Sequence, residues 1–500
     1  MTRGRFLAAA AMAGVAAASL GCEPEGRVRP LKPSRPNAGA WVFLSRPDLR
    51  PPAITVARRP EKTAPGYVFV APKNGPGEAG PGGRGPMILD DEGQPVWFRP
   101  LADDEVDAMD FKAQSYRGRP VISWWQGRHT AYGQGEYTVL DDSYGEVARV
   151  RAGEGFDGDL HEFLLTERGT ALITIYKPLP YDLSAVGGPA DGVAAEGVVQ
   201  EIAVETGEVV FQWRSLEQVG LGESYFPPPA DPAEPYDYIH INSVEVDHDG
   251  NLLVSARKTS AAYKIDRETA EVIWRLGGKR SDFEMGPGTR TVYQHDARRL
   301  PDVTLTLFDN GKEGQSEPSR AIALDLDENA MRASLVRQFI HPTPTLSLTQ
   351  GNLQTLPNGN AFVGWGSEPI FSEFSPNGAL LFDARFQTGV ESYRAFRFPW
   401  VGRPKDWPAV AAEAGPEEGE ISVHASWNGA TEVAAWAVLA GSDPDRLDRL
   451  GSAPRTGFET SIAARTKGPY VRVEALDRRG RTLGRSAAIR PGRWSAPRSA

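Results

Sequence analysis

Three polar residues recur along the chain at one spacing and could do chemistry together. His240 in the string YIHINS and His295 in YQHDAR lie 55 residues apart, and Gln350 in LTQGNL follows after the same interval. Each opens a similar unit of apolar strands and turns, as His161 also does, which is typical of an internal repeat around an axis. Imidazoles held together can bind an anion when charged, relay protons, act as nucleophiles, or ligate a metal when neutral. A purely structural role stays open beside these chemical ones.

The elements that must position these residues are short alternating strands. Two such strands around a turn occur six times, at 87–98, 137–150, 199–213, 260–274, 320–339 and 371–386. The first halves of the units lie between them, at 120–124, 161–176, 240–256, 295–308 and 350–364. Units of about 40 to 55 residues with four strands are typical of β-propeller blades. We therefore predict an all-β fold with a six-bladed propeller over residues 41–400 and one polar ring position per blade facing its channel.

Composition agrees with this fold and limits the partners. A chain of 500 residues with 53 Gly and 41 Pro suits many short strands and turns and is long enough for a large core. Its net charge of −10 argues against nucleic acid or an anionic membrane surface as a partner, because both need a basic footprint.

The N-terminus indicates export. Arg3 and Arg5 precede an apolar run over 6–20, so residues 1–22 resemble a signal peptide. Cys22 is the only cysteine and stands where a bacterial lipoprotein is cleaved and acylated; an ordinary buried cysteine is the alternative. An intrachain disulfide is excluded. We expect a lipid anchor at the cell surface or in the periplasm, with residues 23–40 as an unfolded tether.

The pattern changes after Trp400. Residues 401–418 are rich in Pro, Ala and Glu and are interpreted as a linker. Evenly spaced alternating strands over 419–490, with Trp427 and Trp436 as inward anchors, predict a small β-sandwich of the fibronectin type III kind. We expect residues 491–500 to be a disordered tail.

Several strings of the repeat together resemble one known family. They are YIHINSVEVDHDGNLLVSARKTSAAYKIDRETAEVIWRLGGKRSDF (238–283), YQHDARRL (293–300), LTLFDNG (305–311), SRAIALDLDE (319–328), QGNLQTLPNGNAFVGWGS (350–367) and FSEFSPNGALLFDARF (371–386). They are similar to the arylsulfotransferase family, in its arylsulfotransferase-like branch, over roughly residues 41–400. The resemblance implies a six-bladed propeller with a channel site and transfer of sulfuryl from a phenolic sulfate to a phenol. It implies a sulfo-histidine intermediate, small-molecule aryl sulfate and phenol as partners, and no PAPS or other cofactor.

The resemblance also implies roles for particular residues. His240 and His295 match the family's channel histidines, and Arg320 is the nearest candidate for its channel arginine. His295 is the nucleophile candidate because Gln294 and Asp296 beside it could orient it, whereas His240, His161 and Arg320 would bind the sulfuryl group. No metal site is expected. The other substrate contacts that it implies are Asn242, Asp296, Asn310, Gln350, Asn352 and Trp365.

Two other classes stay open. The family's further histidine, the one that becomes sulfurylated, has no counterpart here, and Gln350 at the sixth ring position cannot be a nucleophile. These losses favour a non-catalytic surface propeller that binds an aryl or sugar ligand. The string over 266–274 is similar to the blade-closing motif of quinoprotein dehydrogenases, although those proteins need eight such closures and this chain supplies six. Tryptophans 124, 125 and 365 could stack on a phenol or pack the core.

Overall fold

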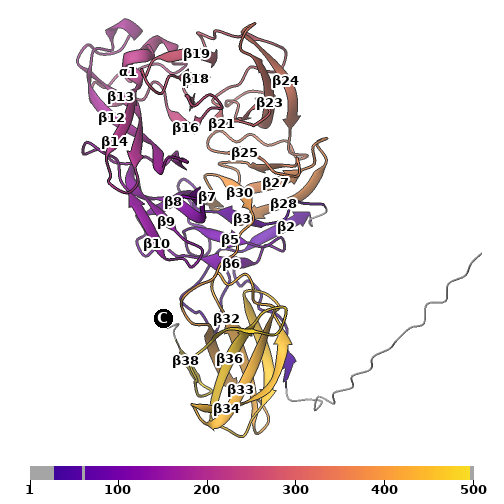
Figure 1. Ribbon diagram of the computed structural model, residues 1–500. Coiled ribbons are helices and arrows are strands. Elements are labelled where there is room, and N and C mark those ends of the chain that lie inside the picture. The colour runs from indigo at the N-terminus through magenta and orange to yellow at the C-terminus, as the bar shows by residue number, and fades with distance from the viewer. Residues whose placement is uncertain (1–27, 59–61, 496–500) are drawn as a thin grey trace, which may run out of the picture.

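The computed structural model describes residues 28–58 and 62–495, so Cys22 and the signal segment lie outside the described residues. The described chain is all-β apart from α1 (Ser215–Gln218) and the short 3-10 turns η1 (Ser184–Val186) and η2 (Leu221–Glu223). Among these residues no helix has the length and hydropathy of a membrane span. The chain forms a larger and a smaller body, which Figure 1 shows one above the other.

Within the described residues the larger body contains six sheets of four or five strands arranged around a centre (Figure 1). The first complete sheet is β7 (Asp107–Tyr116), β8 (Arg119–His129), β9 (Gly133–Leu140) and β10 (Glu146–Val150). The second is β11 (Phe163–Leu165), β12 (Thr170–Tyr181), β13 (Gly192–Ala203) and β14 (Val209–Arg214), with β15 (Pro235–Tyr236) beside β13. The third is β16 (Ile241–Val246), β17 (Leu252–Ala256), β18 (Ala261–Ile265) and β19 (Val272–Gly277).

The remaining sheets complete the ring. The fourth is β21 (His295–Arg299), β22 (Leu305–Asp309), β23 (Arg320–Asp327) and β24 (Arg332–Phe339), with β20 (Glu284–Met285) at its edge. The fifth is β25 (Asn352–Thr355), β26 (Ala361–Gly364), β27 (Ile370–Phe374) and β28 (Leu380–Phe386), extended by β2 (Ile54–Arg58). The sixth is β30 (Ala395–Phe398), β3 (Tyr67–Val70), β5 (Met87–Leu89) and β6 (Pro95–Phe98).

The sixth blade closes the ring by joining distant parts of the chain. Its inner strand β30 pairs with β3, so that Tyr67 lies opposite Phe398. The pair β4 (Lys73–Asn74) and β29 (Val390–Glu391) lies beside this junction. The prediction of an all-β fold with a six-bladed propeller is confirmed. A quinoprotein propeller would need eight blades, and the described chain has six. All six predicted outer strand pairs are present, whereas β7, β2, β3 and the closing strand β30 were not predicted.

Apolar side chains pack neighbouring blades together. Trp213, Tyr238 and Tyr263 are fully buried in one cluster shared by the second and third blades. Trp124 and Trp125 on β8 are likewise fully buried, so they pack the core and are not free to stack on a ligand.

Charged side chains fill the centre of the channel and connect four blades. Arg394, just before β30, binds Asp110 of β7 at 2.7 Å, Glu162 ahead of β11 at 3.3 Å and Asp296 of β21 at 3.3 Å. Lys112 binds Asp110 at 2.7 Å and Glu162 at 2.5 Å. These side chains are almost completely buried, so each charge depends on the others for compensation.

The network continues through Arg298 of β21, which pairs with Glu162 and, at 2.7 Å, with Asp296. Asp110 and Asp296 have left-handed backbone angles, with φ of 56° and 58°, at bulges in β7 and β21. Such angles are unfavourable for aspartate and persist where the surrounding contacts hold them. The bulges turn both carboxylates toward Arg394.

The smaller body is a two-sheet β-module with one shared core that includes Val423, Trp436 and Val473. One sheet has the order β1 (Val28–Pro30), β35 (Glu459–Arg465), β32 (Glu420–Ser426), β31 (Ala409–Ala414) and β38 (Arg493–Ser495). The other has the order β34 (Arg446–Pro454), β33 (Ala435–Asp443), β36 (Tyr470–Leu476) and β37 (Thr482–Arg485). Trp436 is buried as predicted, and Trp427 is partly buried against the core. The fibronectin type III kind stays a prediction.

The predicted boundaries of this module were too narrow. The linker over 401–418 contains β31, the tail over 491–500 contains β38, and the tether over 23–40 contains β1. Each pairs with a strand edge of the module, namely β32, β31 and β35 respectively. Backbone pairing with an available edge holds β1, β31 and β38 in place, although the Pro-, Ala- and Arg-rich composition around them shows no strand alternation.

The axial network predicts a large stability effect at Arg394. Arg394→Met should lower the free energy of unfolding of the propeller by about 3–5 kcal/mol in urea titrations, because it leaves buried carboxylates uncompensated. The control is Arg403→Met, which removes more exposed pairs with Asp142 and Glu432 and should cost at most about 1 kcal/mol. Equal small losses in both variants would contradict a structural role for the network.

Candidate functional site

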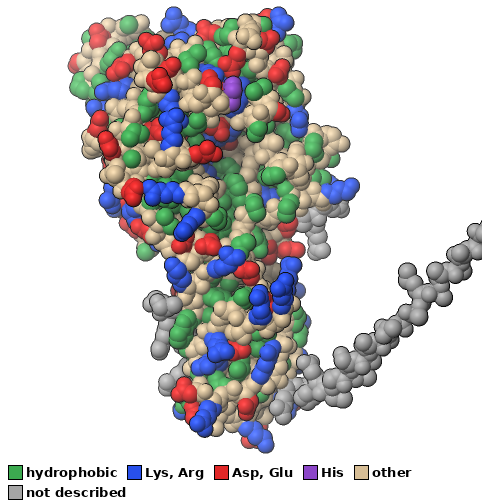
Figure 2. Space-filling model, in the orientation of Figure 1, with side chains coloured by type: hydrophobic (Ala, Val, Ile, Leu, Met, Phe, Trp, Pro, Cys, Tyr) green, Lys and Arg blue, Asp and Glu red, His purple; other side chains and the backbone are tan. Residues whose placement is uncertain are grey.

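Three histidines meet at one end of the channel because each stands at the start of an inner strand. His161 lies two residues before β11, His240 immediately before β16, and His295 is the first residue of β21. The ring centroids of His161 and His240 are 4.9 Å apart, with the rings nearly perpendicular. His295 is near enough that the charges of both other imidazoles act on its pKa. In the view of Figure 2, histidine reaches the propeller surface at one place, beside lysine or arginine side chains.

Each imidazole is oriented through Nδ1. His161 pairs with Asp159, His240 with Asp237 Oδ2 at 2.6 Å, and His295 with Asn310 Oδ1 at 2.7 Å. An oxygen acceptor at Nδ1 keeps the proton on that nitrogen and leaves the lone pair on Nε2. Asp159 and Asp237 are carboxylates and can also stabilise positive charge that develops on their rings.

The Nε2 atoms differ in their availability. His295 is 1% exposed, and its Nε2 accepts a hydrogen bond from the backbone N–H of Gln350 at 3.2 Å. The side chain of His240 is 25% exposed, and within the described chain its Nε2 has no hydrogen-bond partner. His240 therefore presents a free lone pair at the channel mouth, whereas the lone pair of His295 is occupied.

Burial keeps His240 and His295 neutral near pH 7. It lowers the pKa of His240, which the Asp237 carboxylate partly restores. Burial, together with the charge of Arg257, holds the pKa of His295 well below its usual range. The pKa of Asp237 is also low, because His240 and Lys258 outweigh the opposing effect of its burial. A neutral imidazole beside an ionised carboxylate is suited to nucleophilic or base chemistry.

Arg257 is a second cation of this site beside Lys258, and the sequence interpretation missed it. Its backbone N–H donates to the carbonyl of His240 at 2.8 Å, which places it directly across the strand pair. One guanidinium nitrogen donates to Leu348 O at 3.1 Å, while the buried Nε has no partner within the described chain. An unpartnered buried donor is suited to an anionic oxygen. In the sequence, the hairpin of β16 and β17 could have identified Arg257, because pairing Ile241 with Ala256 places residue 257 opposite His240.

Arg320, which the sequence suggested for this role, is engaged elsewhere. Its guanidinium binds Asp309 Oδ2 at 2.9 Å and Gln338 Oε1 at 3.0 Å on its own blade. Asp309 precedes Asn310, so Arg320 supports the segment that orients His295 and does not itself contact the histidines.

The other predicted substrate contacts fall into two groups. Gln350 belongs to the site through its contact with His295, and it also donates to Glu391 at 3.0 Å. The remainder hold the scaffold. Asn242 binds Gln294 O at 2.7 Å, Asn352 binds Ala395 O at 2.9 Å, and Asp296 belongs to the axial network. Trp365 is fully buried with its Nε1 bonded to Ser372, so its ring is not available to a ligand.

Two pairs of aromatic rings lie near the histidines and Arg257. Tyr132 and Tyr176 stack with centroids 5.0 Å apart, and Tyr176 lies 5.8 Å from His240. Phe226 and Tyr293 lie 5.0 Å apart, with the guanidinium of Arg257 over both rings. The arrangement can hold a planar aryl group beside an anion.

Comparisons with known proteins agree with the strings of the repeat. The Arylsulfotransferase (ASST) family model matches residues 112–387, more than half of the chain. The chain has no significant match among curated proteins. A protein of unknown function from Bacteroides caccae is similar at 12% identity and TM-score 0.41, over 66% of this chain and 98% of that one. Streptogramin B lyase is similar at 11% identity and TM-score 0.36, over 67% of this chain and 88% of that one. The Dos1 propeller is similar at 11% identity and TM-score 0.30, over 80% of this chain and 75% of that one. These structural likenesses are too distant to inform the activity.

The carboxylate at His240 predicts a measurable change in titration. Asp237→Asn should lower the pKa of His240 further, because the partner that favours its charged form is removed. Imidazole NMR titration of the folded protein measures this shift. Asp383→Asn is the control, since Asp383 raises the pKa of His341 and the change should leave His240 as it was. An unchanged or raised His240 pKa in Asp237→Asn would contradict the assigned contact.

Proposed function

The chain belongs to the arylsulfotransferase family, and from this premise we propose that it transfers a sulfuryl group from an aryl sulfate to a phenol through His240. The observation that carries the proposal is the pairing of two carboxylate-oriented histidines, His161 and His240, beside Arg257 with its unpartnered donor. The aromatic pairs on either side suit the aryl groups of donor and acceptor.

His240 is preferred over His295 as the nucleophile on geometry. Its Nε2 is free and partly exposed, whereas the same atom of His295 accepts the N–H of Gln350. The sequence favoured His295 because of the residues adjacent to it, but Asp296 beside it serves the axial network. In this proposal His295 and Asn310 position the Gln350 segment at the wall of the site.

In the first step the Nε2 lone pair of His240 attacks sulfur in line. An N–S bond forms and the bond between sulfur and the aryl oxygen breaks. In this proposal His161 begins as an imidazolium with a proton on each ring nitrogen, its charge compensated by Asp159, and the departing oxygen takes the proton from Nε2. Asp237 stabilises the positive charge that develops on the imidazole ring at Nδ1.

In the second step the acceptor phenol displaces the histidine. Its oxygen attacks sulfur and gives its proton to His161, the N–S bond breaks, and the electron pair returns to His240 Nε2. His161 thus ends in the protonation state in which it began, and the proposal calls for no cofactor or metal.

Arg257 has the role of stabilising charge on the sulfuryl oxygens in both steps. A fixed cation in a buried site needs little reorganisation when charge shifts, so its contribution to the transition state is large. Its guanidinium lies over the rings of Phe226 and Tyr293, and these contacts restrict its movement.

A second candidate function is ligand binding without turnover. It is favoured by Gln350, which precedes β25 of the fifth blade and stands at a ring position where a further histidine would be needed for the family's own pattern. The aromatic pairs and Arg257 would serve such a binding propeller equally well.

The test of transfer is release of nitrophenolate from p-nitrophenyl sulfate in the presence of a phenol acceptor. His240→Asn should abolish both turnover and any initial burst, while His295→Asn should retain a measurable rate.

Arg257→Gln should lower the rate by roughly 10² to 10³, as loss of one electrostatic donor commonly does. Arg320→Gln is the matched control. Its rate should stay within about tenfold of the parent rate, because Arg257 remains in place as the donor to the sulfuryl group. Full activity of His240→Asn would refute the assignment, and tight aryl sulfate binding without turnover by the parent would support the binding candidate.

Export through a lipid anchor at Cys22 is a separate proposal that rests on the sequence. Cys22→Ser should move the protein from the membrane fraction to the soluble fraction of the producing bacterium, because the residue that receives the lipid is lost. Immunoblotting of the two fractions measures the change. Unaltered membrane partition of the variant would rule out the anchor.

A further inference from the structure

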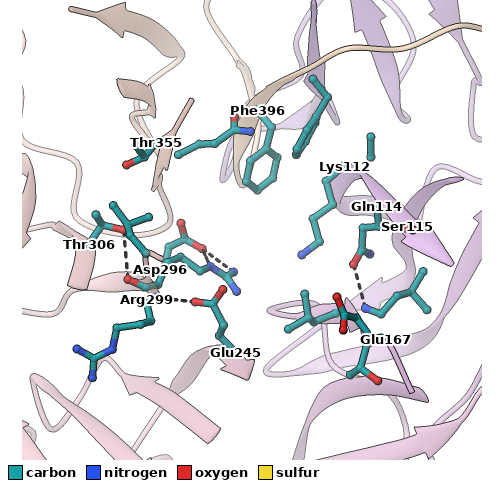
Figure 3. A pocket seen from close by; sticks show the side chains of 18 of the residues that line it. Lys112, Gln114, Ser115, Glu167, Glu245, Asp296, Arg299, Thr306, Thr355 and Phe396 are labelled. Atoms are coloured by element: carbon teal, nitrogen blue, oxygen red, sulfur yellow. Dashed lines mark hydrogen bonds and ion pairs between the residues drawn. The ribbon is translucent and has the colours of Figure 1, made fainter. Parts of the chain in front are cut away.

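A cavity opens at the end of the channel opposite the histidines. It encloses about 660 Å³ and is lined by the far ends of the inner strands and the turns that follow them. Its polar lining includes Lys112 of β7 and Glu245 of β16, and its apolar lining includes Leu164, Leu353 and Phe396. Figure 3 shows Lys112 and Phe396 reaching toward a common space, with Glu245 on the opposite wall. Its size is within the range of small-molecule sites.

The axial charge network separates this cavity from the histidines. On β21, His295 is the first residue and Arg299 the last, and the cavity is lined by Arg298 and Arg299 but not by His295. Asp296 and Arg298 between these ends belong to the network. The two ends of the channel are therefore chemically distinct sites.

Apart from Glu167 at the exposed rim, the charges around the cavity are balanced except for one. Lys112, Arg298 and Arg394 compensate Asp110, Glu162 and Asp296 through the pairs described above. Arg299 is engaged by Asp247 and Glu328. Glu245 accepts the backbone N–H of Arg299 at 2.9 Å, and within the described chain it has no ion pair. The cavity thus contains a carboxylate that lacks a cationic partner.

Burial also makes this carboxylate responsive to a ligand. It raises the pKa of Glu245 to about 7, although Arg298 opposes the effect. A bound cation would restore the charged form and gain a favourable interaction in a partly desolvated setting. An anion gains less here, since Lys112 already has two carboxylate partners and Arg298 is held by Asp296 and Glu162.

We propose that this cavity binds a small organic amine, with the ammonium group against Glu245 and an apolar body against Phe396 and Leu353. The inference stands apart from sulfuryl transfer, because it uses none of the residues at the histidine end. It assigns the channel a second ligand site of opposite preference: a cation at this end and an anion at the other.

The test uses 2-phenylethylamine as the probe and 2-phenylethanol as its neutral counterpart, with isothermal titration calorimetry on the full chain at pH 8. The amine should bind at least about tenfold more tightly than the alcohol, a preference that one charge pair can supply. Glu245→Gln should remove that preference. Glu167→Gln is the matched control, since Glu167 lines the same cavity at its exposed rim, and His240→Asn controls for binding at the histidine end. Both controls should bind the amine as the parent does.

The unaltered chain supplies an independent measurement. Glu245 is ionised above its pKa of about 7 and neutral below it, so amine affinity should fall by roughly tenfold or more between pH 8 and pH 5.5. Five charged groups near Glu245 or across the cavity from it are already paired as described above, namely Arg298, Asp296, Glu162, Arg299 and Lys112. Glu167 lies at the exposed rim and is removed in the control variant. Equal binding of amine and alcohol, amine binding unchanged in Glu245→Gln, or amine binding independent of pH would each overturn the proposal.

Discussion

The mutual compensation of buried charges on the channel axis is the interaction on which the rest of the structure depends. Arg394 extends from the closing blade to carboxylates of three other blades, namely Asp110, Glu162 and Asp296. An isolated buried charge is costly, so each of these groups is tolerated only while the others are in place. The network therefore favours one arrangement of the inner strands, and the aspartates accept unfavourable backbone angles to reach it.

This central network divides one channel into two chemical environments. Toward the starts of the inner strands, neutral imidazoles meet Arg257 and paired aromatic rings. Toward their ends, a cavity lined by both apolar and charged residues contains the Glu245 carboxylate, which has no ion pair within the described chain. The same strand contributes to both, since β21 begins with His295 and ends with Arg298 and Arg299. Because inner strands run alongside one another around the axis, the position of a residue along its strand decides which environment it joins.

The repeat made much of the fold predictable and part of the site. Equal spacing placed His240 and His295 at equivalent blade positions, and all outer strand pairs follow from alternation and turn residues. Other features depended on pairing between distant segments. The closing strand β30 meets β3 from more than 300 residues away, and β1 completes a sheet of the C-terminal module. Neither segment has a local pattern strong enough to predict its partner.

The sequence by itself determined the class of the fold, the number of blades and the histidines at the channel, because strand alternation and repeat spacing are local properties of the chain. Only the tertiary structure decided which side chains lie together in the candidate site. It placed Arg257, not Arg320, beside the histidines and enclosed Trp365 in the core. It also left the Nε2 of His240 free while that of His295 is occupied. Hydrogen-bond partners and burial are set by contacts between blades, and residue spacing along the chain does not specify them.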